Sequence, residues 1–146
     1  MTAPRKTARL KLAELLGPAL VGPGLPAQAV YPYRRGDFAG QSPVVAVTSG
    51  PIEHVADGFG CTKAAFQLLV FIFVLYADPA SGWTEGNAED TLDEIEAIIA
   101  EVTAANSRSE AWTQIKYAAP TQPNPVVIGG VEYLRELITF DVEVKQ

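Results

Sequence analysis

The chain has few residues of the kinds that form disulfides or hold metals. Among its 146 residues there is one cysteine, Cys61, and one histidine, His54. A single cysteine has no partner for a disulfide within the chain, and a Cys/His metal cage would need ligands from a second chain. The sequence therefore predicts neither a disulfide scaffold nor a Cys/His metal centre of its own.

Long apolar runs are also missing. The most apolar segment, 64–77, is 14 residues long and contains Gln67, whereas a membrane-spanning helix needs about 20 apolar residues. Segment 10–16 is interrupted by Lys11 and Glu14, unlike the uniform apolar run of a signal peptide. We expect a soluble protein that is made in a cytoplasm and has no membrane partner.

The chain does have enough apolar sequence for one core. Hydrophobic residues make up 48% of it and charged residues 19%, which excludes disorder of the whole chain, since disorder needs low hydrophobicity and high charge. The length fits a single domain over 1–146 that buries about 68% of the surface of the extended chain.

Charge is distributed unevenly along the chain. Residues 1–35 hold six basic side chains and one acidic one, which sums to +5; the remainder holds 5 basic and 16 acidic side chains, which sums to −11, and together these give −6. The acidic balance argues against uniform nucleic-acid binding. The basic opening has three interpretations: a solvated helix face, a contact with an acidic protein such as another copy, or binding to nucleic acid or a membrane surface.

The N-terminal part is predicted to hold one helix and a long loop. Residues 4–16 form an amphipathic helix, with Pro4 in the first turn and Gly17-Pro18 as its end. Residues 17–41 are rich in glycine and proline, which predicts an ordered loop with a short extended piece at Val30-Tyr31. We therefore divide the domain into a basic helix plus Pro/Gly-rich loop (1–41) and a sheet-helix body (42–146).

A hairpin with one very long arm is predicted next. Pro43–Ser49 is a β-branched run typical of a strand, and 52–56 and 62–76 flank a turn at 57–60. In the second arm the even positions are all apolar or aromatic, whereas the odd positions become apolar only from Leu69. One face should be covered throughout and the other only in the later half. At about 3.3 Å per residue the arm would span roughly 50 Å, so it bends or its hairpin end projects.

A second helix and further strands complete the pattern. Residues 88–105 carry apolar side chains at helical spacing, with Asn87 as the N-cap and with Glu89 and Asp90 in the first turn. Strands are predicted at 112–118, 126–128 and 138–145, with a loop at 120–125 and a turn or bulge at Gly129-Gly130. The order predicts an α+β single domain: a mostly antiparallel (mixed) β-sheet, two helices packed on one face and a projecting β-hairpin.

The clusters of titratable side chains are better explained by structural roles than by catalysis or metal binding. An acidic run on the second helix, which no His or Cys joins, fits a solvated face better than a metal or acid–base site; it comprises Glu89, Asp90, Asp93, Glu94 and Glu96. His54 and the adjacent Glu53 would point to opposite faces of a strand. Cys61 could meet His54 across the hairpin, but no third group or oxyanion device is visible.

The remaining motifs indicate backbone and packing roles. Gly22-Pro23-Gly24 and Gly129-Gly130 lack the spacing of a phosphate-binding or dinucleotide-binding loop. Trp83 and Trp112 are interpreted as packing residues. We predict no catalytic residue, no cofactor and no metal.

An ordered set of segments over about 40–146 resembles the tail terminator proteins of long-tailed, siphovirus-type phages, the group of the lambda tail terminator. These are PVVAVTSG, a hairpin into FQLLVFIFVLYAD, GWTEGNAEDTLDEIEAIIAEV, the Trp-led AWTQIKYAAP, and Gly-Gly-Val-Glu-Tyr at 129–133 before a terminal alternating strand. The Gly-Gly-x-x-Tyr element is the sharpest part, and 17–41 is less recognisable.

The resemblance implies a structural virion protein that acts by binding and has no enzymatic activity. Such a subunit would close into a hexameric ring, end polymerisation of the major tail tube protein and offer the head-joining surface to a head-completion or connector protein. DNA would pass through an acidic lumen without specific binding. Alternatives are a tail-completion or head–tail connector (neck) subunit, or a small α+β ligand-binding domain or enzyme.

The protein interface is predicted in the basic opening and at the hairpin end. The basic opening would meet the acidic body of the next copy, and the hairpin would dock on the tube or on a neighbouring subunit. The predicted interface residues are Arg5, Lys6, Arg9, Lys11, Arg34, Arg35, Asp57, Phe59 and Lys63.

Overall fold

The computed structural model describes residues 3–56, 58, 60–76 and 78–145. The helices are α1 (Pro4–Leu20) and α2 (Glu85–Ala105), with a short 3-10 turn, η1 (Pro79–Ser81), between them. The strands are β1 (Ala29–Tyr31), β2 (Val44–Ala56), β3 (Thr62–Leu75), β4 (Gln114–Tyr117), β5 (Asn124–Ile128) and β6 (Val131–Lys145).

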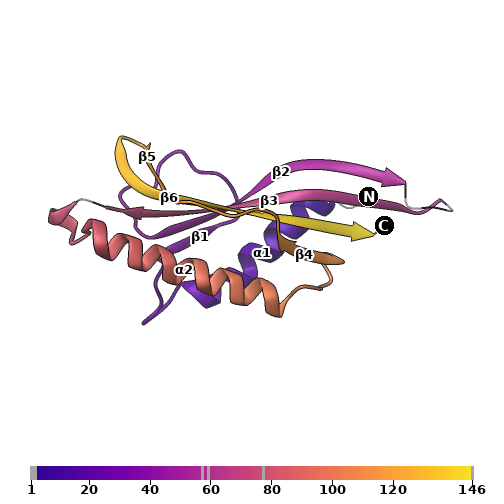
Figure 1. Cartoon of the computed structure of the whole chain (residues 1–146), viewed down its shortest axis with the longest axis horizontal. Helices are drawn as coiled ribbons and strands as arrows, with labels where there is room; N and C mark the ends of the chain where they lie inside the picture. Colours follow the sequence, from indigo (N-terminus) through magenta and orange to yellow (C-terminus); the bar gives the residue numbers. More distant parts are fainter. Residues whose placement is uncertain (1–2, 57, 59, 77, 146) are drawn as a thin grey trace.

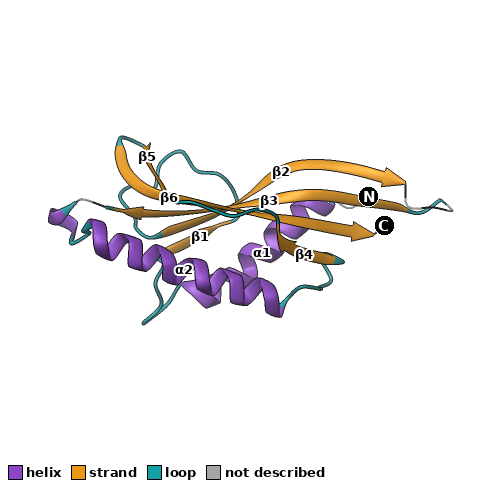
Figure 2. Cartoon of the chain, in the orientation of Figure 1, coloured by secondary structure: helices purple, strands orange, loops and turns teal. Residues whose placement is uncertain are grey.

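The strands form one mixed sheet with both helices on a single face (Figures 1 and 2). The strand order is β1-β2-β3-β6-β4, and β5 also pairs with β6. Only the β1–β2 pairing is parallel; the others are antiparallel. The predicted α+β class, the mostly antiparallel sheet and the placement of two helices on one face are confirmed.

The main core lies between the helices and the even-numbered face of β3. Leu68, Val70 and Ile72 of this face are fully buried, as are Leu12 of α1 and Ile95 of α2. The buried positions therefore recur every two residues in the strand and about every 3.6 residues in the helices, as the spacing of apolar residues in the sequence predicts.

A smaller second core covers one end of the opposite, helix-free face. Phe38, from the loop at 32–42, packs against Phe73 and Tyr133, with ring centroids 4.8 and 5.6 Å apart. The odd positions of β3 are accordingly buried at Phe73 and Leu75 and only half-buried from Lys63 to Phe71. Coverage of this face is confirmed at Phe73 and Leu75 but begins later than predicted, because Leu69 and Phe71 stay half-buried. We call the rest of it the open face.

Helix α1 does not end at Gly17-Pro18 as predicted. It continues to Leu20, with Pro18 inside its last turn. Pro18 removes one helix hydrogen bond, but Leu20 extends the buried stripe of Ala8, Leu12 and Leu16 by one more turn. Burial of a further leucine, worth about 1.5–3 kcal/mol, offsets the cost of the proline.

Helix α2 begins three residues earlier than predicted, and Asn87 is not its N-cap. Thr84 is the cap: its Oγ1 accepts from Asn87 N at 3.2 Å, while Asn87 Oδ1 accepts from Thr84 N at 2.7 Å. Asn87 thus completes a capping box as the third helical residue. Glu85, and not Glu89, is the acidic residue of the first turn.

The strand boundaries also differ. The predicted strands at 43–49 and 52–56 are one strand, β2, with a bulge between Ser49 and Ile52. β6 starts at Val131, β5 begins inside the predicted loop, and β4 is shorter than predicted. β2 and β3 form the predicted antiparallel hairpin as far as Ala56 and Thr62; Asp57 and Phe59 at its tip lie outside the described residues, and the projection stays a prediction.

Candidate protein-interaction site

Two of the predicted interface arginines form hydrogen bonds between α1 and β2. Arg5 Nη1 donates to the carbonyl oxygen of Gly50 at 2.7 Å, and Arg9 Nη1 donates to Ser49 Oγ at 2.7 Å. Both bonds tie α1 to the bulge of β2, where the ladder is interrupted and backbone groups need other partners. These bonds give Arg5 and Arg9 a structural role that the sequence analysis did not anticipate.

The predicted lysines lie at the surface, and two form weak ion pairs. Lys11 Nζ lies 3.3 Å from Glu110 Oε1 and 3.9 Å from Glu14 Oε1, and Lys63 Nζ lies 3.7 Å from Glu143 Oε1. Exposed pairs of this kind contribute about 0–1 kcal/mol. Lys6 is exposed and has no ion pair or hydrogen bond within the described ranges.

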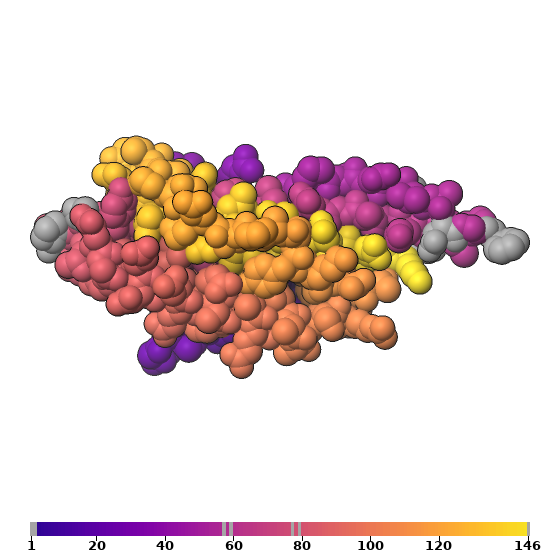
Figure 3. Space-filling view, in the orientation of Figure 1, coloured from indigo at the N-terminus to yellow at the C-terminus, as the bar shows by residue number. Residues whose placement is uncertain are grey.

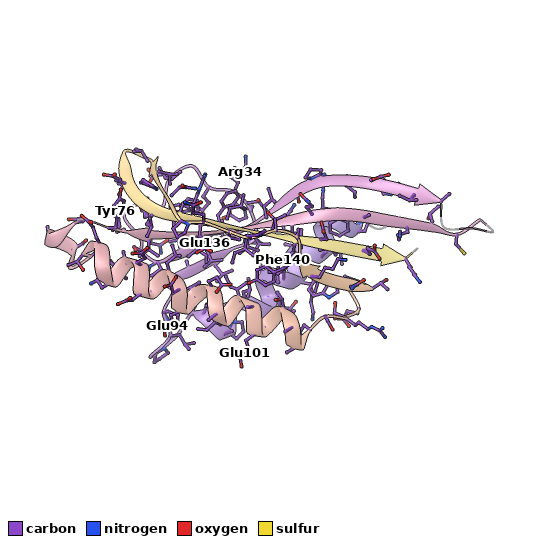
Figure 4. The ribbon with its side chains drawn as sticks, viewed as in Figure 1. Arg34, Tyr76, Glu94, Glu101, Glu136 and Phe140 are labelled. Carbon is purple, nitrogen blue, oxygen red and sulfur yellow. The ribbon has the colours of Figure 1, made fainter. Side chains whose placement is uncertain are left out.

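Arg34 and Arg35 line a groove at the open face. One cavity, of about 270 Å³, has Arg34, Arg35 and Arg135 at its rim and Phe71, Phe73 and Ile128 in its walls. A second, of about 330 Å³, shares Arg34 and Thr48 with it and adds Arg9, Tyr33 and Ser49. We call the two adjoining cavities the arginine groove. Figure 4 shows Arg34 on the opposite side of the sheet from Glu94 and Glu101 of α2.

Aromatic rings support two of the guanidinium groups. Arg35 Cζ lies 4.5 Å from the ring centroid of Tyr31, and Arg135 Cζ lies 5.5 Å from that of Phe71. Such cation–π contacts contribute about 0.5–1 kcal/mol at exposed sites. They orient the guanidinium groups without neutralising their charge.

The arginines of the groove form no ion pair among the described residues, and the carboxyl group that lies near the groove is that of Asp37, beside Gly129. Within the described part of the chain, no carboxylate oxygen lies within 4.0 Å of Arg34, Arg35 or Arg135. Arg9 Nε is buried and has no hydrogen-bond partner among the residues that the structure describes. The groove is therefore a local excess of positive charge on a chain whose net charge is −6.

Exposed carboxylates gather on the outer side of α2. Glu89, Asp90, Asp93, Glu94 and Glu101 are exposed, and within the described residues none of them forms an ion pair. Glu94 and Glu101 point away from the sheet (Figure 4), and α2 covers much of the lower surface in the space-filling view (Figure 3). We call these five carboxylates the acidic row. The described residues contain no group of three or more possible His, Cys, Asp or Glu metal ligands, so the acidic row fits a solvated surface.

Among the described residues, Glu136 is the one buried carboxyl group of the helix-covered face. It is 5% exposed and accepts a hydrogen bond from Thr121 Oγ1. Burial raises the pKa of Glu136, the negative charges of Glu96 and Asp93 add to the increase, and the Thr121 hydrogen bond opposes it. Next to it, burial and a 3.0 Å hydrogen bond to Glu96 raise the pKa of Tyr117.

The described residues at the hairpin end of the sheet include a wide cavity and two exposed side chains, His54 and Cys61. A cavity of about 500 Å³ on the open face is lined by mixed polar side chains, including Glu53, Gln67 and Asp141. His54 and Cys61 are both exposed. Trp112 is buried and donates from Nε1 to Asn106 O at 2.9 Å, in agreement with its predicted packing role.

Comparisons with known proteins give no relative: no family model matches the sequence, and no curated protein matches it. Among the described helices, none combines the length and the apolarity needed to cross a bilayer.

Proposed function

We propose that this chain is a structural subunit of a phage tail. As a tail terminator it closes into a hexameric ring on the tail tube, ends polymerisation of the major tail tube protein and provides the surface for head joining. It is assembled in the host cytoplasm and resides at the head-proximal end of the virion tail. The resemblance over 40–146 supports this proposal, and so does a surface on which the two signs of charge lie apart.

The observation that carries the proposal is the division of charge across the helical layer. α1 packs over β1 and β2, whereas α2 packs over β3, β6 and β4. The helices thus occupy opposite sides of one layer. The α1 side exposes Lys6, 43% of Leu10 and one carboxylate, Glu14, which lies 3.9 Å from Lys11 Nζ, and the α2 side exposes the acidic row.

This division suits a contact that repeats from copy to copy. The α1 side of one copy would meet the α2 side of the next, which is a heterologous contact and closes into a ring when the rotation fits. Lys6 would supply the charge and Leu10 the apolar area. Carboxylates of α2 left outside the contact would line the lumen and repel DNA.

A head–tail connector subunit is the second candidate. The open face, which no helix covers, leaves a wide surface for a protein other than another copy. A connector would bind the head side, whereas a terminator binds a preassembled tail tube at one end.

The test combines assembly state with binding to tubes. Light scattering and negative-stain microscopy should show a ring with a central hole, and the ring should cap one end of preassembled tubes. Lys6→Glu with Leu10→Glu should weaken assembly about tenfold or more, because it places repulsive charge against the acidic row. Lys116→Glu with Val127→Glu is the matched control, since it makes the same changes at exposed positions outside α1.

Two results would contradict the proposal. A protein that stays monomeric at high concentration and does not bind tubes cannot be a terminator. Loss of assembly in the control pair but not in the Lys6 pair would mean that the contact does not use α1.

A further inference from the structure

The arginine groove brings together four guanidinium groups from distant parts of the chain. Arg9 comes from α1, Arg34 and Arg35 from the loop at 32–42, and Arg135 from β6. The single hydrogen bond formed by these guanidinium groups within the described residues is the one from Arg9 to Ser49. Arg34, Arg35 and Arg135 line one cavity, and Arg9 lines the second cavity with Arg34. Like charges that share a cavity repel one another, and an anion bound between them lowers that cost.

We propose that the arginine groove binds an extended acidic peptide segment of another protein. The carboxylates of the peptide would lie at the arginines, and an apolar side chain would enter the cavity lined by Phe71, Phe73 and Ile128. This site goes beyond the proposed function, because it does not depend on whether the chain forms a ring.

The arginines have the geometry that carboxylates need. A guanidinium group presents planar pairs of N–H donors that match a carboxylate in bidentate fashion. The contacts of Arg35 with Tyr31 and of Arg135 with Phe71 place each Cζ over a ring, and a guanidinium that lies on a ring keeps its edge donors available. A carboxylate bound there gains charge-assisted hydrogen bonds without ordering a free side chain.

The cavity beside the arginines is built for an apolar group. Its walls include Phe71, Phe73 and Ile128, and Phe38 closes its base. Its volume of about 270 Å³ is too small for more than a side chain or two. A ligand that fills it must combine negative charge with an apolar side chain, as an acidic peptide with interspersed hydrophobic residues does.

The charge of the chain favours a short acidic peptide over a nucleic acid. The net charge of −6 opposes a long polyanion more than a short acidic segment. The apolar walls formed by Phe71, Phe73 and Ile128 also suit the apolar side chain that a peptide can carry beside its carboxylates.

Fluorescence anisotropy with defined probes tests the proposal. The probe is a labelled peptide of alternating glutamate and valine with one central phenylalanine. A peptide with glutamine in place of every glutamate and a single-stranded oligothymidine of similar length are measured beside it. The protein variants are Arg34→Gln with Arg135→Gln and, as a matched control, Arg108→Gln, an exposed arginine that does not line the groove.

The acidic peptide should bind in a salt-sensitive manner, and the glutamine peptide should not. The double variant should weaken binding about tenfold or more, since it removes two charge-assisted contacts, while Arg108→Gln should leave it unchanged. Circular dichroism checks that the variants fold.

Several results would overturn the assignment. Oligothymidine binding as tight as the acidic peptide would make the groove a nucleic-acid site, and equal binding by wild type and double variant would place the peptide elsewhere. Light scattering of the same samples separates this site from ring formation. A double variant that loses self-association but keeps peptide binding would assign the groove to a contact between copies. Intact peptide binding in a protein that never assembles would refute the terminator proposal alone.

Discussion

Replacing Phe38 by alanine should release the loop that carries Arg34 and Arg35. Phe38 is 2% exposed, and its ring lies 4.8 Å from that of Phe73 and 5.6 Å from that of Tyr133. Truncation of a buried phenylalanine costs about 3–5 kcal/mol, as lost transfer free energy plus a cavity. This is a large fraction of the roughly 5–15 kcal/mol that stabilises a domain.

The position of Phe38 determines which part of the fold the substitution destabilises. It is the buried apolar residue that the loop at 32–42 contributes to the second core, so its loss should favour local opening of the loop over unfolding of the sheet. A cost of about 3 kcal/mol raises the population of the open loop roughly a hundredfold. Trypsin should then cleave after Arg34 and Arg35 much faster than in wild type.

Urea unfolding, followed by tryptophan fluorescence, and the rate of limited proteolysis measure the two effects. Tyr33→Ala is the matched control on the same loop, because Tyr33 is 52% exposed, and its change in unfolding free energy should stay within about 0.5 kcal/mol. A loss below about 1 kcal/mol for Phe38→Ala, with an unchanged rate of cleavage, would refute Phe38 as the anchor of the loop.

Two further substitutions test other parts of the fold. A Cβ at Gly50 would lie 2.9 Å from Gln67 Cβ and 3.0 Å from its carbonyl oxygen, so Gly50→Ala should lower the unfolding free energy by about 1–3 kcal/mol. Gly86→Ala, on α2 with open space around it, should not lower it; equal urea midpoints for both would show that the bulge tolerates a side chain. The pKa of Glu136 is raised in the folded state above its ordinary value of 4.5, so its contribution to stability is fully present below that value and is lost as pH rises through the folded pKa. Glu136→Gln should therefore flatten the fall in unfolding free energy that follows as pH rises above the ordinary value of 4.5, and an identical pH profile in wild type and variant would contradict this.

The parts of the fold that follow from local pattern were predictable from the sequence. Alternation identified β3 and the later half of β6, and the spacing of Leu92, Ile95 and Ile99 identified α2. The errors fall where tertiary burial or capping outweighs local preference. Leu20 carries α1 past Pro18, and Thr84 caps α2 through Asn87.

The sequence predicted only some of the residues of the candidate site. Arg34 and Arg35 were predicted to lie at an interface because they belong to the basic opening. Arg135 was missed, since it lies about a hundred residues away and the start of β6 was placed too late. No sequence signal separates Arg9, which bonds to β2, from Lys6, which is exposed.

The register between β3 and β6 has a consequence for how fast the chain can fold. The longest ladder joins Lys63–Leu75 to Tyr133–Lys145, about 60–80 residues further along the chain. Contacts this distant in sequence pay loop-closure entropy before they gain stability, which slows folding. A ribosome must release residues beyond Tyr133 before β3 begins to gain its second neighbour, and residues up to about 145 before the ladder is complete. Until then one edge of β3 stays unpaired and open to chaperones and to misassociation.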